Sequence, residues 1–499
     1  MYVLYATSRN DYRLTHCNVG LVISIDMLPD EVLLEIFHFY VVEAMEEEDI
    51  YLKNKMSAWQ TLVHVCRRWR GVVFRSPRRL DLRLICPTKT HVIDKVDVWP
   101  ALPLVIENFD CQTEDVDNII ALLEHSELVR RISHIELWEI RLEDISKAME
   151  VPFPELIDLA LHHDYETEPA ILSDAFLGGS APRLQLLILD NIPFPALPKL
   201  LSSAIVLTDL YLENIPHSGY ISPEAMVACL SLLTNLDGLS LQFQSPQSHP
   251  DRESRRPPPP KRTVLPALTR FWFSGVSEYI EDLVVRVDAP RLNSLRITFF
   301  NDIAFDTPQF SQFIGRIPTF KAFDKASVDL GDAFAGIKLS SKSKTSRREP
   351  LNLNVRISCR ELDWQVPSLE QICTSSLPSL STLEDLYIYE NAYPEKPVWE
   401  NNIDSTLWLG LLSHFTTVKN LYLSEEIASH IATALEELVG ERKTEVLPSL
   451  QNIYLEDSEL QPSGLVQPEE SVRKFVAARQ VTNHPIVVSR CSRDRLSWL

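Results

Sequence analysis

Residue types that commonly carry out catalysis occur in this chain, but the sequence brings few of them together. The densest group is His162-His163-Asp164, at the end of an apolar run that predicts a β-strand. Adjacent residues of a strand point to opposite faces, so the two imidazoles do not converge easily on one metal ion. The chain contains no Gly-x-Gly-x-x-Gly, Gly-x-x-x-x-Gly-Lys or Gly-x-Ser-x-Gly motif. We therefore predict no catalytic site, no metal and no cofactor.

Aromatic residues recur at one position of several predicted strands, which points to binding. The pattern is a Tyr between apolar residues with a carboxylate nearby, in Asp209-Leu210-Tyr211-Leu212-Glu213, Asp385-Leu386-Tyr387-Ile388-Tyr389-Glu390, Asn420-Leu421-Tyr422-Leu423-Ser424-Glu425 and Asn452-Ile453-Tyr454-Leu455-Glu456. Exposed aromatics beside carboxylates are typical interface anchors, and they suit a basic partner. Tyr also favours strands and packs against its ladder neighbours, and that alternative stays open. The predicted binding set is Trp138, Tyr211, Trp272, Tyr387, Tyr389, Tyr422 and Tyr454.

An irregular repeat positions these aromatic residues along the chain. Its core is apolar-x-x-apolar-x-apolar, and copies begin at Ile132, Leu156, Leu184, Leu207, Leu236, Leu268, Leu292, Leu383, Val418 and Leu450. Uninterrupted copies follow one another at roughly 23 to 35 residues, which brackets the period of leucine-rich repeats. The polar and aromatic residues that flank the apolar positions are expected on the opposite face of the strands.

Helical patterns lie between the predicted strands. The clearest are residues 115–123, 223–230, 277–287, 406–414 and 425–438. One strand and one helix per repeat predict an α/β solenoid, with parallel strands on the concave face and helices on the convex face. The pattern resembles degenerate leucine-rich repeats, in which the Asn that follows the strand is kept only at Asn191, Asn214 and Asn391.

Composition limits the classes of partner. The 499 residues carry a net charge of −21, which disfavours nucleic acid and anionic membranes. The eight cysteines form no Cys-x-x-Cys pair and indicate a reducing compartment, cytoplasmic, nuclear or both. No apolar run is long enough to cross a membrane. Residues 1–24 lack the apolar core of a secretory signal and are expected to be a disordered extension.

The segment from 25 to 80 predicts a small bundle of three helices with more apolar residues than it can bury. Pro29 suits the first position of a helix, and Asp30 and Glu31 fall in its first turn. The apolar residues Val32, Leu33, Ile36, Phe37 and Tyr40 follow with helical spacing, and Trp59, Leu62, Val63, Cys66 and Trp69 form a second pattern. Part of this apolar surface therefore needs a partner.

Two motifs within this segment resemble an F-box. They are Leu28-Pro29-Asp30-Glu31-Val32-Leu33-Leu34-Glu35-Ile36-Phe37, and Leu62-Val63-His64-Val65-Cys66-Arg67-Arg68-Trp69-Arg70 followed by Ser76-Pro77. The chain is similar to the expanded F-box family of mushroom-forming fungi, apart from an acidic stretch at 43–50 that lengthens the join between the first two helices. The family implies docking on a Skp-type adaptor, and through it on a cullin. The predicted adaptor-binding residues are Leu28, Pro29, Leu33, Ile36, Leu62, Val65, Cys66 and Trp69.

The expected organisation is an F-box at 25–80 and a leucine-rich-repeat-like solenoid at 81–480. Insertions are expected at 244–261 and 331–350, and a C-terminal tail at 481–499. The resemblance implies a non-catalytic, substrate-recognition subunit of an SCF-type ubiquitin ligase whose repeats bind a target protein. Two alternatives remain open: a scaffold that binds the adaptor without forming a ligase, and an enzyme with an unrecognised site in the repeats.

Overall fold

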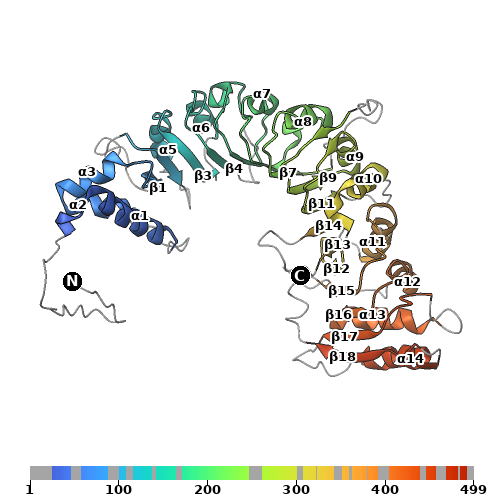
Figure 1. Cartoon of the computed structure of the whole chain (residues 1–499). Helices are drawn as coiled ribbons and strands as arrows, with labels where there is room; N and C mark the ends of the chain where they lie inside the picture. The colour runs from blue at the N-terminus through green and yellow to red at the C-terminus, as the bar shows by residue number, and fades with distance from the viewer. Residues whose placement is uncertain are drawn as a thin grey trace, which may run out of the picture.

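A computed structural model places the elements in one arc, with strands along its inner side and helices along its outer side (Figure 1). The structure describes residues 25–46, 58–87, 101–107, 116–137, 142–163, 171–246, 261–300, 307–321, 323–341, 351–358, 362–378, 380–390, 404–438, 445–456, 468–481 and 484–491. The predicted α/β solenoid with a concave sheet and convex helices is confirmed.

The inner layer, as far as the structure describes it, is a 16-stranded sheet. In spatial order its strands are β1 (Leu84–Pro87), β2 (Leu104–Glu107), β3 (Val129–Leu137), β4 (Asp158–His163), β5 (Leu186–Asp190), β6 (Asp209–Ile215), β7 (Gly238–Phe243), β9 (Arg270–Gly275), β11 (Ser294–Phe300), β14 (Asn352–Ser358), β13 (Phe334–Ser340), β12 (Lys325–Leu330), β15 (Asp385–Glu390), β16 (Asn420–Leu423), β17 (Asn452–Glu456) and β18 (Val487–Cys491). Neighbours pair in parallel, except that β13 is antiparallel to both β12 and β14. The short strands β8 (Thr263–Val264) and β10 (Val287–Asp288) form a separate parallel pair.

The outer layer consists of helices that connect successive strands. They are α5 (Val116–Leu123), α6 (Leu142–Ala148), η3 (Phe176–Gly179), α7 (Leu197–Leu201), η4 (His217–Gly219), α8 (Pro223–Leu230), α9 (Ser277–Val284), α10 (Pro308–Arg316), η6 (Pro318–Lys321), α11 (Leu362–Ser375), α12 (Ser405–Ser413), α13 (Glu425–Glu436) and α14 (Pro468–Val481). The five helical patterns singled out in the sequence correspond to α5, α8, α9, α12 and α13, so those predictions are confirmed.

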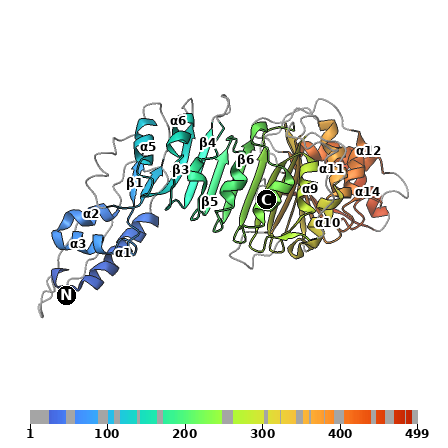
Figure 2. The same ribbon diagram turned by 90° about the horizontal axis from the view of Figure 1, so that it is seen from above.

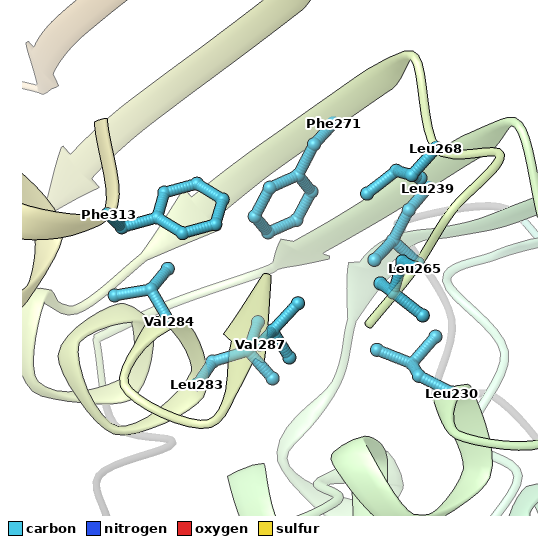
Figure 3. A pocket seen from close by; sticks show the side chains of 9 residues that line it. All are labelled: Leu230, Leu239, Leu265, Leu268, Phe271, Leu283, Val284, Val287 and Phe313. Atoms are coloured by element: carbon cyan, nitrogen blue, oxygen red, sulfur yellow. The ribbon is translucent and has the colours of Figure 1, made fainter. Parts of the chain in front are cut away.

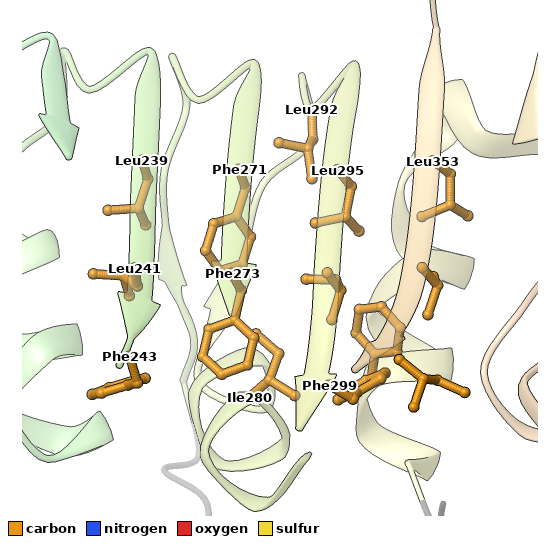
Figure 4. Close-up of a cluster of buried hydrophobic side chains, with 14 of the residues drawn as sticks. Leu239, Leu241, Phe243, Phe271, Phe273, Ile280, Leu292, Leu295, Phe299 and Leu353 are labelled. Atoms are coloured by element: carbon orange, nitrogen blue, oxygen red, sulfur yellow. The ribbon is translucent and has the colours of Figure 1, made fainter. Parts of the chain in front are cut away.

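The repeated apolar positions form the core between the two layers (Figure 4). Leu210, Leu239, Phe271, Leu295 and Leu353 are register partners on neighbouring strands and are all buried. Equivalent positions therefore stack across the sheet, and each repeat covers the apolar edge of the one before it.

Two asparagines at the ends of strands, Asn191 just after β5 and Asn214 near the end of β6, have backbone conformations that explain their residue type. Asn191 has φ 53° and Asn214 has φ 47°, in the left-handed region that Asn tolerates better than most residues. Asn191 donates from Nδ2 to the carbonyl of His163, and Asn214 donates from Nδ2 to Asp190 Oδ1. These side chains connect neighbouring repeats where the strands end. Asn391 lies outside the described residues.

A helical module precedes the sheet and lies beside β1 in Figure 2. It contains η1 (Ile25–Met27), α1 (Asp30–Glu46), α2 (Ala58–Val65) and α3 (Arg67–Arg75). The second helical pattern of the sequence is interrupted at Cys66, whose Sγ accepts a hydrogen bond from the backbone N–H of Trp69 and caps α3. The module has a core of its own, to which all three α-helices contribute buried residues such as Phe37, Trp59 and Val73.

Several strands lie where the sequence predicted none. Within the insertion expected at 331–350, residues 334–340 form β13 in the middle of the sheet, and β12 and β14 flank it in sequence and in space. Within the tail expected at 481–499, residues 487–491 form β18 and pair with β17. Several core positions of these strands carry small or β-branched residues in place of leucine, as in Ala326 and Val328 of β12, which makes the repeat harder to recognise. The insertion expected at 244–261 lies largely outside the described residues.

Candidate functional site

The outer side of α1 is one candidate binding surface. Five apolar residues on this helix are exposed, namely Val32, Ile36, Phe39, Tyr40 and Val42. Phe39 is 70% exposed, which is unusual for a side chain of its size. Val32, Ile36, Phe39 and Tyr40 follow the spacing of one broad helix face. A contiguous exposed apolar face of this kind marks an interaction surface.

The structure divides the predicted adaptor-binding residues into three groups. Leu33 and Leu62 are buried in the core of the module, so their side chains support the fold and do not form its surface. Leu28, Cys66 and Trp69 are half-buried. Pro29, Ile36 and Val65 are exposed, and Val65 at the end of α2 is 58% exposed. The sequence did not single out Phe39 for this set, although its place in the apolar pattern of α1 is a signal that could have found it.

Polar contacts fix the start of α1 against α3. Arg68 pairs with Asp30 at 2.8 Å and also donates to the carbonyl of Leu28. The Trp69 ring lies 4.7 Å from the Phe37 ring, between centroids. The Leu-Pro turn at residues 28 and 29 is therefore held by the Arg-Arg-Trp segment, which gives a structural reason for the two motifs to occur together.

The concave face of the sheet is the second candidate surface. One register position can be followed across ten neighbouring strands, and we call it the middle row. In spatial order it consists of Tyr211, Ser240, Trp272, Arg296, Asn354, Lys338, Ser327, Tyr387, Tyr422 and Tyr454. The apolar neighbours of these residues in each strand are buried under the helices, so the middle row lies on the inner side of the arc.

Three predicted tyrosines form a stacked ladder in the middle row. The rings of Tyr387 and Tyr422 lie 4.2 Å apart at 6°, and those of Tyr422 and Tyr454 lie 4.5 Å apart at 10°. Burial, together with Tyr422 and Asp385, raises the pKa of the Tyr387 phenol. Both faces of Tyr422 are covered by its neighbours, so cation–π contact with a basic partner is limited to the ends of the ladder. Lys325 occupies one end, with its ammonium 5.9 Å from the Tyr387 ring.

Tyr211 and Trp272 form a separate aromatic pair, with ring centroids 5.8 Å apart, on β6 and β9. The Tyr211 hydroxyl donates to Asp209, and Arg270 pairs at 2.9 Å with both Asp209 and Asp237. Burial and the nearby Asp209 raise the pKa of Tyr211 to about 12. The carboxylates beside these aromatics therefore already have partners within the chain.

A cationic cluster occupies the middle of the concave face, where the sequence predicted no site. It consists of Arg296 on β11, Lys338 on β13 and Arg356 on β14. Arg356 pairs at 3.1 Å with Asp329 of β12, which is 4% exposed. Burial raises the pKa of Asp329, although Arg356 opposes that shift. Tyr389, from the predicted set, lies beside this pair, and burial raises its pKa to about 12. Trp138 lies outside the described residues.

A cavity between the sheet and the helices belongs to the core (Figure 3). Its lining is entirely apolar and consists of Leu230, Leu239, Leu265, Leu268, Phe271, Leu283, Val284, Val287 and Phe313. In the described part of the chain no three His, Cys, Asp or Glu side chains gather as metal ligands would. No described helix is both long and apolar enough to cross a membrane.

No protein-family model matches this chain, and no curated protein matches it. One similar solved structure is the leucine-rich repeat-containing protein LegL7 from Legionella pneumophila, which is 10% identical, with coverage of 79% of this chain and 97% of that chain and a TM-score of 0.27. The strand order and the helix placement of this chain themselves define the repeat solenoid.

Proposed function

We propose that the chain is a non-catalytic receptor subunit of a ubiquitin ligase. In this proposal the N-terminal module is an F-box that docks on a Skp-type adaptor, and the concave sheet holds a target protein. The observation that carries the proposal is the exposed apolar face of α1, on a module that carries both F-box motifs. Such a subunit acts by proximity, because it holds the target near an enzyme that performs the chemistry.

The apolar face of α1 favours a permanent partner. The module already buries a core that includes Leu33, Phe37, Trp59 and Val63, yet Ile36 and Phe39 remain in water. Burial of apolar surface contributes about 25 cal/mol per Å², so covering several such side chains stabilises a complex by a few kcal/mol before the costs of association. An adaptor groove that accepts one helix face fits this arrangement.

The concave face suits a protein partner that is exchanged, in contrast to the permanent partner of α1. Its middle row carries aromatic, cationic and small polar side chains on a sheet that is rigidly supported by the helices behind it. Interfaces of this composition use aromatic and Arg anchors for affinity and polar contacts for specificity. The two surfaces belong to different elements, so binding of the adaptor leaves the sheet open.

Adaptor binding can be tested with the double variant Ile36→Ser, Val65→Ser. Both side chains are exposed, so the fold is expected to survive their loss, whereas Leu33 and Leu62 would be poor choices. If both lie at the centre of the interface, the variant should lose about 2 kcal/mol of binding free energy, or roughly 30-fold in Kd for a purified Skp-type adaptor. Surface plasmon resonance with immobilised adaptor measures this loss.

The matched control is Ile171→Ser, Ile205→Ser, since these residues are 57% and 56% exposed but lie in the repeats. The control should bind the adaptor like the unmodified chain. Equal adaptor affinity of the two double variants would contradict the proposal. Co-purification of a cullin with the adaptor separates a ligase subunit from a scaffold, because a scaffold brings down the adaptor alone.

A further inference from the structure

The middle of the concave face carries three cations, and only one of them has a carboxylate within 4 Å among the described residues. Among the described residues Arg356 has a carboxylate partner in Asp329, whereas Arg296 and Lys338 have none within 4 Å. The whole chain has a net charge of −21. Two cations that have no carboxylate within 4 Å in the part of the chain that the structure describes therefore call for an explanation other than general solubility.

Strand order brings these cations together. Arg296 and Lys338 occupy the middle row on either side of Asn354, since β14 lies between β11 and β13. Neighbouring strands are about 4.8 Å apart, so the two backbones are separated by about 10 Å. Long side chains from both strands can reach one small group above Asn354. Arg356 follows Asn354 by two residues on the same strand and faces the same side.

Aromatic rings hold the two guanidinium groups. The Arg296 guanidinium lies 5.5 Å from the centre of the Trp272 ring, and the Arg356 guanidinium lies 4.8 Å from the centre of the Phe334 ring. Stacking on a ring limits the rotamers of a long side chain, so less entropy is lost when a ligand binds. The buried Nε–H of Arg356 has no acceptor in the described part of the chain. An oxygen atom from a ligand would satisfy this donor.

The electrostatics of the cluster agree with this geometry. Burial lowers the pKa of Arg296, and the neighbouring Arg356 lowers it further. Burial also lowers the pKa of Lys338; Asp329 opposes that shift, and Arg296 and Arg356 add to it. The three cations repel one another in a partly buried setting, and a bound anion would relieve that repulsion.

We propose that this cluster binds an oxyanion, a carboxylate or a phosphate, carried by a segment of the protein partner, with Arg296, Lys338 and Arg356 as its ligands. The proposal rests on the proposed role of the repeats as a receptor. It revises the expectation of a basic partner, because Asp209, Asp237 and Asp329 on this face pair with arginines, whereas Arg296 and Lys338 have no carboxylate within 4 Å in the described part of the chain. Arg supplies forked donors that match carboxylate and phosphate oxygens.

The test uses the full chain and a fluorescein-labelled tetraglutamate peptide, with binding followed by fluorescence anisotropy. General electrostatics oppose binding of this peptide to a chain of charge −21, so saturable binding requires a local site. The variant Arg296→Gln, Lys338→Gln should bind the peptide at least about tenfold more weakly. Inorganic phosphate and acetate are then compared as competitors. If phosphate displaces the peptide at a lower concentration than acetate does, the natural ligand group is assigned as a phosphate. If acetate does so at the lower concentration, the group is assigned as a carboxylate. Either result supports the site.

Two controls isolate the cluster from net charge and from folding. Arg291→Gln, Lys321→Gln removes the same charge from exposed positions outside the sheet and should leave peptide affinity unchanged. Lys338→Arg keeps the charge and should retain affinity within about threefold. An unchanged thermal unfolding curve of Arg296→Gln, Lys338→Gln excludes misfolding as the cause of a loss. The proposal is overturned if the chain does not bind the peptide, or if Arg296→Gln, Lys338→Gln binds it as the unmodified chain does.

The result of the peptide-binding test does not depend on binding of the adaptor. Arg296→Gln, Lys338→Gln should still bind the Skp-type adaptor, because both residues are remote in sequence and fold from α1. Failure of adaptor binding by the unmodified chain would refute the proposed function and leave peptide binding intact. Failure of peptide binding alone would refute the oxyanion site and leave the receptor role in place.

Discussion

Two glycines allow ion pairs to form over an intervening strand. Gly238 of β7 lies between Asp209 of β6 and Arg270 of β9, which are its register partners on either side. Gly336 of β13 lies in the same way between Asp329 and Arg356. A Cβ built on Gly336 would lie 2.5 Å from Asp329 Oδ1 and 2.8 Å from Arg356 Cγ. At both positions the missing side chain provides the space through which the charged groups meet.

Replacement of Gly238 with Ala should therefore destabilise the repeats. The new Cβ would meet Asp209 Oδ1 and would lie 2.8 Å from the Tyr211 hydroxyl, so the pair between Arg270 and Asp209 has to open. We expect a loss of about 1–3 kcal/mol in the free energy of unfolding, measured by urea denaturation. The control is Gly315→Ala in α10, where nothing lies within 4 Å and a small gain is expected. Equal effects of both substitutions would contradict this account of Gly238.

At the scale of elements, helices are tied to their neighbours by side chains as well as by the core. Glu281 of α9 accepts hydrogen bonds from the backbone N–H groups of Gln309 at 3.0 Å and Phe310 at 2.7 Å, in the first turn of α10. The carboxylate thereby satisfies donors that a helix start leaves open, and its charge suits the helix dipole. Glu281 is 8% exposed, so this contact is within the convex layer and not on its surface.

Glu281→Ala should weaken the contact between α9 and α10. The loss leaves two N–H groups of α10 without an acceptor in a buried setting, and a cost of about 1–2 kcal/mol in stability is expected. Hydrogen exchange of the amides of Gln309 and Phe310 should accelerate more than exchange in α13. Glu437→Ala changes an exposed carboxylate at the C-cap position of α13, and this control should leave both regions unchanged. Unaltered exchange in α10 would show that Glu281 is not its cap.

The strands were easiest to predict from the sequence where large apolar residues, mostly leucine, occupy the core positions. Strands whose core residues are large, such as β5 and β6, stood out because the apolar-x-x-apolar-x-apolar spacing is distinctive. Strand β14 was missed although Asn352-Leu353-Asn354-Val355-Arg356-Ile357-Ser358 alternates polar and apolar residues over its whole length, which is a strand signal. The antiparallel pairing of β13 is determined by tertiary contacts, because it depends on which strand edge is available when the chain turns back to the sheet.

At the scale of the molecule, these missed strands also concealed part of the candidate site. The stacked tyrosines could be predicted, because Tyr387, Tyr422 and Tyr454 occur in similar sequence motifs on consecutive repeats. The cationic cluster could not, since Arg296 and Arg356 become neighbours only through the spatial order β11, β14, β13. The sequence predicted that the segment from 25 to 80 carries more apolar residues than it can bury. Only the structure shows which of them are buried, such as Leu33, and which are exposed, such as Ile36.

The junction between the module and the solenoid carries the last prediction, because the core of the module continues past the boundary expected between residues 80 and 81. Leu82 and Leu102 belong to the same buried cluster as Phe37 and Trp59, and Trp59 donates from Nε1 to the carbonyl of Arg83 at 3.0 Å. A fragment of residues 25–80 lacks all of these partners. A fragment of residues 25–107 keeps them and adds β1 and β2, which pair with each other.

The longer fragment should therefore be more stable by about 2–5 kcal/mol, since removing two buried leucines and an indole partner has a cost of that order. Thermal unfolding followed by circular dichroism compares the two fragments directly. Leu102→Ala in the full chain is a milder form of the same test and should lower the melting temperature of the module and the first strands, while the later repeats are unaffected. Equal stability of the two fragments would place the boundary at residue 80 and make the module independent of the sheet. Higher stability of the longer one means that the module and the first strands fold as one unit, so that a partner bound to α1 is held in a fixed orientation to the concave face.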